Sequence, residues 1–166
     1  MVSLHLHRVS FVFTIVTLSI SFPLYTHSFD FTEATVDSIQ EAFRNRSLNS
    51  VQLVQHYLSM IRKLNPRLRA VIEVNPDALT LAAQADLDRE RNQSNRNRLH
   101  GIPILVKDNI GTADKLNTTA GSFALLGSVV SRDSGVVKKL REAGAVILGK
   151  ASDVWFPYSF SNQIKP

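Results

Sequence analysis

The segment between Asp133 and Leu148 restricts the fold of this 166-residue chain more than any other part of the sequence. Asp133 or Ser134 can cap a helix, and Gly144 supplies the left-handed residue that ends it. An apolar strand, residues 145–148, follows directly. Basic residues lie toward the C-terminal half of the helix, where they suit its dipole. The predicted apolar stripe of this helix consists of Val136, Val137, Leu140 and Ala143.

A second apolar run, Ile102 to Val106, lies earlier in the chain and is typical of a strand that is buried on both faces. Strand, crossover helix and strand in this order predict a parallel α/β unit with helices packed on its sheet. The chain contains no cysteine, so its hydrophobic core must stabilise it without disulfides or thiolate metal sites.

Two helices are predicted in the N-terminal part of the chain after residue 28. The first covers Thr35 to Phe43, with Thr35 as its N-cap. The second is capped by Ser50 and ends at the Asn65-Pro66 pair, because a proline disfavours helical backbone in the residue before it. The predicted apolar face of the second helix consists of Leu53, Val54, Tyr57, Leu58 and Ile61.

A short strand and a third helix are predicted next. The strand covers Leu68 to Val74 and ends at a turn, and the helix is opened by Asp77 and runs to about Arg91. Small alanines on the buried side of this helix indicate close packing rather than a ligand site. That predicted side consists of Ala78, Leu79, Ala82, Ala83 and Leu87.

The first 28 residues have the features of a cleaved secretory signal peptide. They contain no Asp or Glu, and a weakly basic start leads into an apolar run from Phe11 to Ile20. An uncleaved anchor and an organelle transit peptide are the alternatives. Early polar interruptions argue against the first, since a stable membrane span needs about 18 to 20 continuous apolar residues. The single Arg argues against the second, and we therefore expect a secreted or vacuolar protein.

Three Asn-X-Ser/Thr triplets, at Asn45, Asn92 and Asn117, would be usable for glycosylation in such a protein. The densest positive charge lies between Arg89 and Arg98, but no aromatic residue interleaves with it, so we predict a solvated loop and no nucleic-acid partner. The histidines have no metal-binding spacing, and His100 is interpreted as a structural loop residue. We expect no metal and no other cofactor.

Lys107 directly follows the predicted strand Ile102 to Val106. Loops at the C-terminal ends of parallel strands are where α/β folds place their functional sites. Burial would lower the pKa of such a lysine, and the neutral amine would then act as a base toward a serine hydroxyl. The alternative is a solvated lysine at a strand end beside Asp108, and this stretch alone favours that alternative.

Three segments, taken in order, resemble the amidase signature family. They are LHGIPILVKDNI at residues 99–110, TTAGSFAL at Thr118 to Leu125, and DSGVVKKLREAGAVILGKAS at Asp133 to Ser152. The earlier stretch SVQLVQHYLSMIRKLNPRLRAVIEVNPDAL is similar to the N-terminal helices of that family. The resemblance covers roughly residues 30 to 152, which is most of the chain after the predicted signal peptide.

The resemblance implies a partial amidase-signature fold of the α/β class, in which N-terminal helices pack on an incomplete parallel or mixed sheet. It also implies hydrolysis of a small-molecule carboxylic amide by a Ser-cisSer-Lys triad, with Lys107 as its base. In that mechanism the lysine and a bridging serine activate a nucleophilic serine, and backbone amides stabilise the oxyanion of the intermediate.

The sequence departs from the family in two places. Both triad serines belong, in that family, to a glycine- and serine-rich segment several dozen residues beyond the lysine, and no such segment occurs before Pro166. Ser122 lacks the paired glycines of a nucleophile elbow, so we expect it to cap a helix. The domain is therefore assigned to residues 29–166, with a family-like part to about residue 152 and a divergent aromatic tail at 153–166.

Three functions are compatible with these observations. The favoured one is an N-terminal portion of an amidase that carries only the base of its triad and is inactive alone. A second is a non-catalytic binding or regulatory protein, which would form a homo-oligomer or dock a partner through an open sheet edge at 102–106 or 145–148. The third is a protein like the amidase-related subunit of a tRNA-dependent amidotransferase, against which the secretory-looking N-terminus argues.

Overall fold

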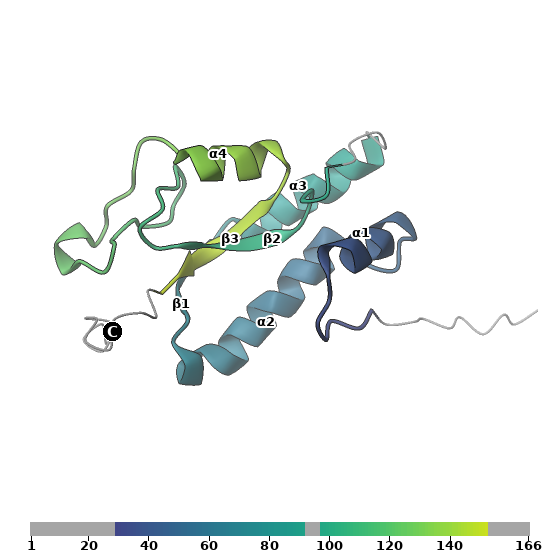
Figure 1. The fold of residues 1–166 in the computed structure, drawn as a ribbon, viewed down its shortest axis with the longest axis horizontal. Coiled ribbons are helices and arrows are strands. Elements are labelled where there is room, and N and C mark those ends of the chain that lie inside the picture. Colours follow the sequence, from purple (N-terminus) through teal and green to yellow (C-terminus); the bar gives the residue numbers. More distant parts are fainter. Residues whose placement is uncertain (1–28, 92–96, 153–166) are drawn as a thin grey trace, which may run out of the picture.

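A computed structural model describes residues 29–91 and 97–152 of the chain. The predicted signal peptide, the sequon at Asn92 and the aromatic tail at 153–166 lie outside the described residues. The described elements, shown in Figure 1, are α1 (Val36–Arg44), α2 (Ser50–Leu68), β1 (Val71–Val74), α3 (Ala78–Arg91), β2 (Pro103–Lys107), the short 3-10 helix η1 (Phe123–Leu125), α4 (Gly135–Glu142) and β3 (Val146–Ala151).

The three strands form one mixed sheet in the order β1-β3-β2. Strand β2 runs parallel to β3, with Lys107 opposite Ala151, whereas β1 runs antiparallel to β3. The predicted parallel unit and the α/β class are therefore confirmed. Because β3 is central, the segment 145–148 has no open edge, and in the described part of the chain β2 and β1 are the two edge strands.

Helices cover both faces of this sheet, and α1 packs at its end (Figure 1). Helix α4 covers one face over a buried cluster of Val106, Leu116, Val137 and Ile147. Helices α2 and α3 cover the other face, over Val54, Ala78, Ala82, Val146 and Leu148. A third cluster joins α1 and α2 to the start of β2 and contains Ile39, Ala42, Phe43, Leu48, Leu53 and Ile102.

The first two helices begin at side-chain caps. Thr35 caps α1 as predicted, through a reciprocal pair of hydrogen bonds with Ser38. The prediction that Ser50 caps α2 is wrong: Asn49 is the cap, and its side chain accepts a hydrogen bond from the Gln52 amide at 2.7 Å. Ser50 is already helical, and its amide donates to the Asp86 carboxylate of α3 at 2.8 Å.

Helix α2 also continues past the predicted end at Asn65-Pro66 and stops at Leu68. Pro66 lies in the last turn, where its missing amide removes one helical hydrogen bond. Beyond the proline, the Asn65 side chain bonds both the amide and the carbonyl of Val71 at 2.9 and 2.8 Å. These contacts hold the end of α2 against the start of β1.

On α3 and α4, the predicted apolar face is broader than the face that is buried in the structure. On α3, Leu79 and Leu87 are 41% and 45% exposed, and Ala83 is also exposed, while Ala85 is buried. On α4, Val136 is half exposed. Close packing of α3 on α2 through small alanines leaves only a narrow buried stripe on α3. The apolar periodicity of the sequence therefore predicted a wider buried face than the neighbouring elements cover.

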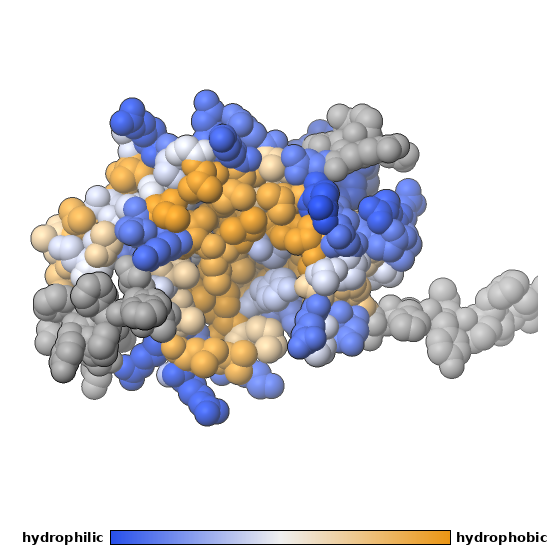
Figure 2. Space-filling model, viewed as in Figure 1, coloured by the Kyte–Doolittle hydropathy of each residue, from blue (hydrophilic) through white to orange (hydrophobic). Residues whose placement is uncertain are grey.

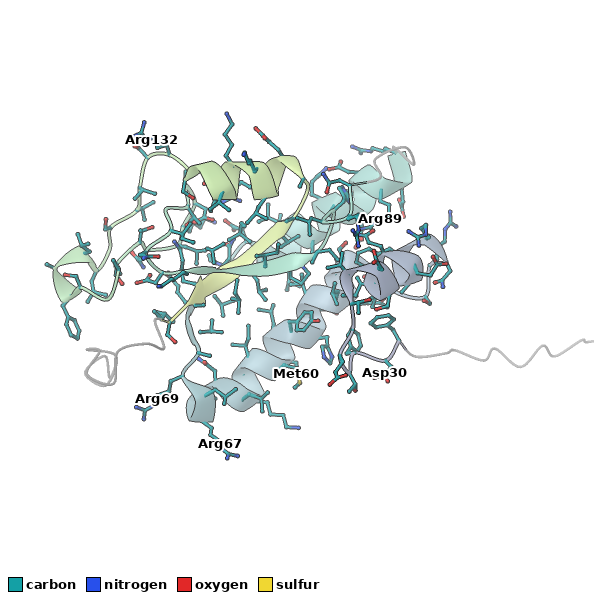
Figure 3. All side chains as sticks on the ribbon, in the orientation of Figure 1. Asp30, Met60, Arg67, Arg69, Arg89 and Arg132 are labelled. Carbon is teal, nitrogen blue, oxygen red and sulfur yellow. The ribbon has the colours of Figure 1, made fainter. Side chains whose placement is uncertain are left out.

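Arg89 is a partly buried residue that joins the three N-terminal helices. Figure 3 shows it between α3 and α1, whereas Arg67 and Arg132 extend away from the molecule. Its guanidinium donates to the Ser50 hydroxyl at 2.8 Å and lies 4.1 Å from the centre of the Phe43 ring. Nearby His100 is buried, as a structural residue should be, and this burial, followed by the charge of Arg89, lowers the pKa of its imidazole.

Figure 2 shows that apolar surface gathers across the middle of the molecule, where Figure 1 places the sheet. A groove of about 290 Å³ lies between α1, α2 and β2, and Ile39, Tyr57 and Leu105 are among its lining residues. Three strand residues, Ile72, Val74 and Leu105, are 37% to 44% exposed. The described residues therefore leave part of the sheet's apolar surface uncovered.

Candidate functional site

Lys107 is the last residue of β2, at the C-terminal end of the parallel pair. The register places it opposite Ala151 of β3. Its side chain is exposed in the described residues, as the solvated alternative predicts, so the burial that the base hypothesis expects is not present there. Leu105, two residues earlier, points to the same face of the sheet and is 38% exposed, which also corrects the prediction of a strand buried on both faces.

A tight turn follows Lys107. The Ile110 amide donates to the Lys107 carbonyl at 2.9 Å, and the Asp108 amide donates to the Ala151 carbonyl of β3 at 3.1 Å. The backbone of Lys107 is thus held both by the sheet and by the turn. Whatever fixes Ile110 therefore also fixes the direction in which the chain leaves Lys107.

Asp108 is buried, with 4% of its surface exposed. Its carboxylate accepts hydrogen bonds from the Thr119 hydroxyl at 2.5 Å, the Gly121 amide at 3.2 Å and the Thr119 amide at 3.4 Å. Ala120 and Gly121 both have left-handed backbone, with φ of 49° and 77°. A left-handed alanine carries strain, and the carboxylate offsets it by fixing the residues on either side.

Lys150 is a buried lysine that the sequence analysis did not select. It lies near the C-terminal end of the central strand β3, is 0% exposed, and donates from Nζ to the Ile110 carbonyl at 2.5 Å and the Thr118 hydroxyl at 3.3 Å. Burial lowers the pKa of its ammonium, while the negative charges of Asp108, Asp114 and Glu73 act in the opposite direction.

Glu73 of β1 holds the same loop at a third point. Its carboxylate accepts from the Asn117 amide at 2.8 Å and from the Asn117 side chain at 3.1 and 3.2 Å. The acceptor nitrogen of the Asn117 sequon is therefore engaged inside the fold. Asn45, by contrast, is exposed at the end of α1.

Ser122 and Ser152 are two serines near this site, and each adjoins an end of a helix or strand. Ser122 occupies the N-cap position of η1 as expected, but its side chain forms no capping hydrogen bond. Ser152 follows β3, and its hydroxyl donates to the Arg69 carbonyl at 3.0 Å. Within residues 29–91 and 97–152, no group of three His, Cys, Asp or Glu side chains is placed to hold a metal ion. No helix in that part of the chain has both the length and the apolar character needed to cross a membrane.

Comparison with known proteins identifies the family that this arrangement resembles. A family model described as Amidase matches residues 52–159. A probable amidase of Arabidopsis thaliana is 62% identical over 126 residues, which are 75% of this chain and 25% of that protein. A glutamyl-tRNA(Gln) amidotransferase subunit of Bdellovibrio bacteriovorus is 35% identical over 134 residues, or 81% of this chain and 27% of that protein.

Solved structures of amidases indicate the same family as the sequence comparisons. The native peptide amidase of Stenotrophomonas maltophilia superposes with a TM-score of 0.68 at 45% identity, over 73% of this chain and 25% of that one. An amidase family protein of Bacillus anthracis gives a TM-score of 0.68 at 38% identity, over 72% and 24%. The chain thus spans about a quarter of the length of the relatives it matches.

Proposed function

Because the chain belongs to the amidase family, we propose that it forms the N-terminal part of a hydrolase of carboxylic amides and provides the base of the catalytic triad. The base is Lys107. The observation that carries this proposal is the position of Lys107 at the C-terminal end of β2, followed by a turn that buried charged side chains hold in place. A backbone held in this way gives the lysine a fixed point of attachment, and general-base catalysis depends on such positioning.

In the proposed reaction the neutral Lys107 amine accepts a proton, through a bridging serine, from a nucleophilic serine. That nucleophile attacks the amide carbonyl, an acyl-enzyme forms, and the proton is returned to the departing amine. Water then hydrolyses the acyl-enzyme. This chain supplies the proton acceptor and its mounting, and both serines belong to residues outside the chain.

The exposed surface around Lys107 supports a site that is completed by further residues. General-base catalysis by a lysine requires the unprotonated amine, which a desolvated environment favours. Leu105 and Val74 are exposed apolar residues on the same face of the sheet. Cover over these residues would also exclude water from the surroundings of the amine.

The proposal predicts that the purified chain does not hydrolyse simple amides and anilides. Without the nucleophile no acyl-enzyme forms, so Lys107→Ala should leave the background rate unchanged, as should the control Lys115→Ala at another exposed lysine. Product release can be followed by absorbance with a nitroanilide. Turnover by the chain that Lys107→Ala abolishes would refute the proposal.

A further inference from the structure

Three charged side chains, in β1, in β3 and directly after β2, bind and so anchor the loop that follows Lys107. Asp108, the residue after β2, binds Thr119 and Gly121. Glu73 of β1 binds Asn117, and Lys150 of β3 binds the Ile110 carbonyl and Thr118. The register pairs Glu73 with Lys150, and Asp108 lies two residues beyond Val106, the residue that pairs with Lys150 on the other side.

The central anchor, Lys150, is unusual because it is a fully buried ammonium. Lysine is almost never fully buried unless it is paired, and moving its charge out of water is costly. The negative charges of Asp108, Asp114 and Glu73 favour the ammonium only in part against that burial. A long apolar residue would fill the same space without this cost. What it would not do is donate hydrogen bonds to the Ile110 carbonyl and the Thr118 hydroxyl.

Those two hydrogen bonds connect the two ends of the loop. Ile110 belongs to the turn that carries Lys107, since its amide bonds the Lys107 carbonyl at 2.9 Å. Thr118 adjoins Thr119, whose hydroxyl and amide bond Asp108, the residue after Lys107. A single ammonium group therefore clamps the turn on one side and the returning segment on the other.

We propose that Lys150 is a positioning residue for Lys107, whose buried ammonium locks the 107–110 turn against segment 117–121 and so fixes the direction of the Lys107 side chain. The benefit for catalysis rests on the proposed function of Lys107. The coupling between Lys150 and the 107–110 turn does not depend on that function, because every residue that takes part in it belongs to this chain.

Hydrogen exchange of the full chain, followed by NMR, tests the coupling. Lys150→Met keeps the approximate length of the side chain but removes the hydrogen-bond donors of the ammonium group. In this variant the Ile110 and Thr118 amides should exchange at least tenfold faster. The Leu53 amide in the core of α2 should change less than twofold, because it lies away from this loop. Lys150→Arg, which keeps charge and donors, should restore most of the protection, and the control Lys115→Met should change none of these amides.

A second readout reports on Lys107 directly. With lysine labelled at Cε, the Lys107 signal should move in Lys150→Met and return toward its original position in Lys150→Arg, which a general packing role would not produce. Unchanged Ile110 and Thr118 exchange in folded Lys150→Met, or an equal increase at Leu53, would overturn the proposal.

If Lys150→Met does not fold, the variant Thr118→Val provides the test of the coupling instead. This variant removes one acceptor of the Lys150 ammonium and leaves the charge in place. Faster exchange at Ile110 supports the clamp, and unchanged exchange overturns it. None of these measurements requires turnover, so a failure here is separate from a failure of the proposed amidase function.

Discussion

Exchange of Lys107 for Met should lower kcat by roughly 10³-fold or more in a chimera in which the matched residues of this chain replace those of the Arabidopsis relative. The chimera itself should hydrolyse amides, because this chain would supply the base and the relative would supply the serines. Met retains the length and apolar stem of the side chain but accepts no proton. The nucleophilic serine would then lack the group that removes its proton.

The matched control is Lys115→Met in the same chimera. Lys115 is exposed and forms an ion pair with Asp77 at 2.8 Å, and the proposed mechanism gives it no role. Surface ion pairs of this kind contribute at most about 1 kcal/mol. Steady-state kinetics with a nitroanilide would measure both variants. A Lys107→Met chimera as active as Lys115→Met would remove Lys107 from the mechanism.

Gly149→Ala should destabilise the fold by about 3 kcal/mol, a large part of the stability of a small domain. Gly149 lies in the central strand opposite Val74 of β1. A methyl group there would overlap the Glu73 carbonyl oxygen and lie 3.1 Å from the Val74 Cα. Both are backbone atoms of the neighbouring strand, which cannot rotate away, so β1 would have to separate from β3.

Gly135→Ala is the control for this exchange. Gly135 opens α4, and apart from its chain neighbours and the backbone of its own helix no atom lies within 4 Å of the position that its added methyl group would take. Its stability should change by less than about 1 kcal/mol, with alanine's helix propensity acting in favour of the variant. Urea unfolding followed by circular dichroism gives both values. Equal midpoints for the two variants would contradict the packing described at Gly149.

The sequence predicted best where the signal is local. The cap at Ser134, the left-handed Gly144 and the parallel pairing of β2 with β3 are all confirmed. Each depends on a few neighbouring residues whose backbone preferences point the same way. The family resemblance is confirmed by the comparisons and rests on segments of the same kind.

Predictions that depended on distant residues were less accurate. Ser50 was chosen as a cap because of its type, but its amide is satisfied by Asp86, 36 residues later in the chain. The Asn65-Pro66 pair was taken as a helix end, but α2 continues to Leu68, and the Asn65 side chain binds the Val71 backbone beyond the helix. Neither partner could be inferred from the helix itself.

Lys107 and Lys150 show the same limit at the candidate site. Sequence reasoning placed Lys107 at a strand end correctly and left open whether it is buried or solvated, whereas Lys150, which is fully buried, was not selected at all. Lys150 is buried only because the loop 110–121 folds back over its strand. A predicted strand extended through residue 151 would have been the one available signal.

The central claim is that Lys107 serves a nucleophile located outside this chain, and labelling with a fluorophosphonate probe tests it most directly. Mass spectrometry after incubation should find no labelled serine in the isolated chain. In the chimera it should find one labelled serine, outside the transplanted residues, and Lys107→Met should abolish that labelling. Stoichiometric, Lys107-dependent labelling of a serine within the isolated chain would contradict the account.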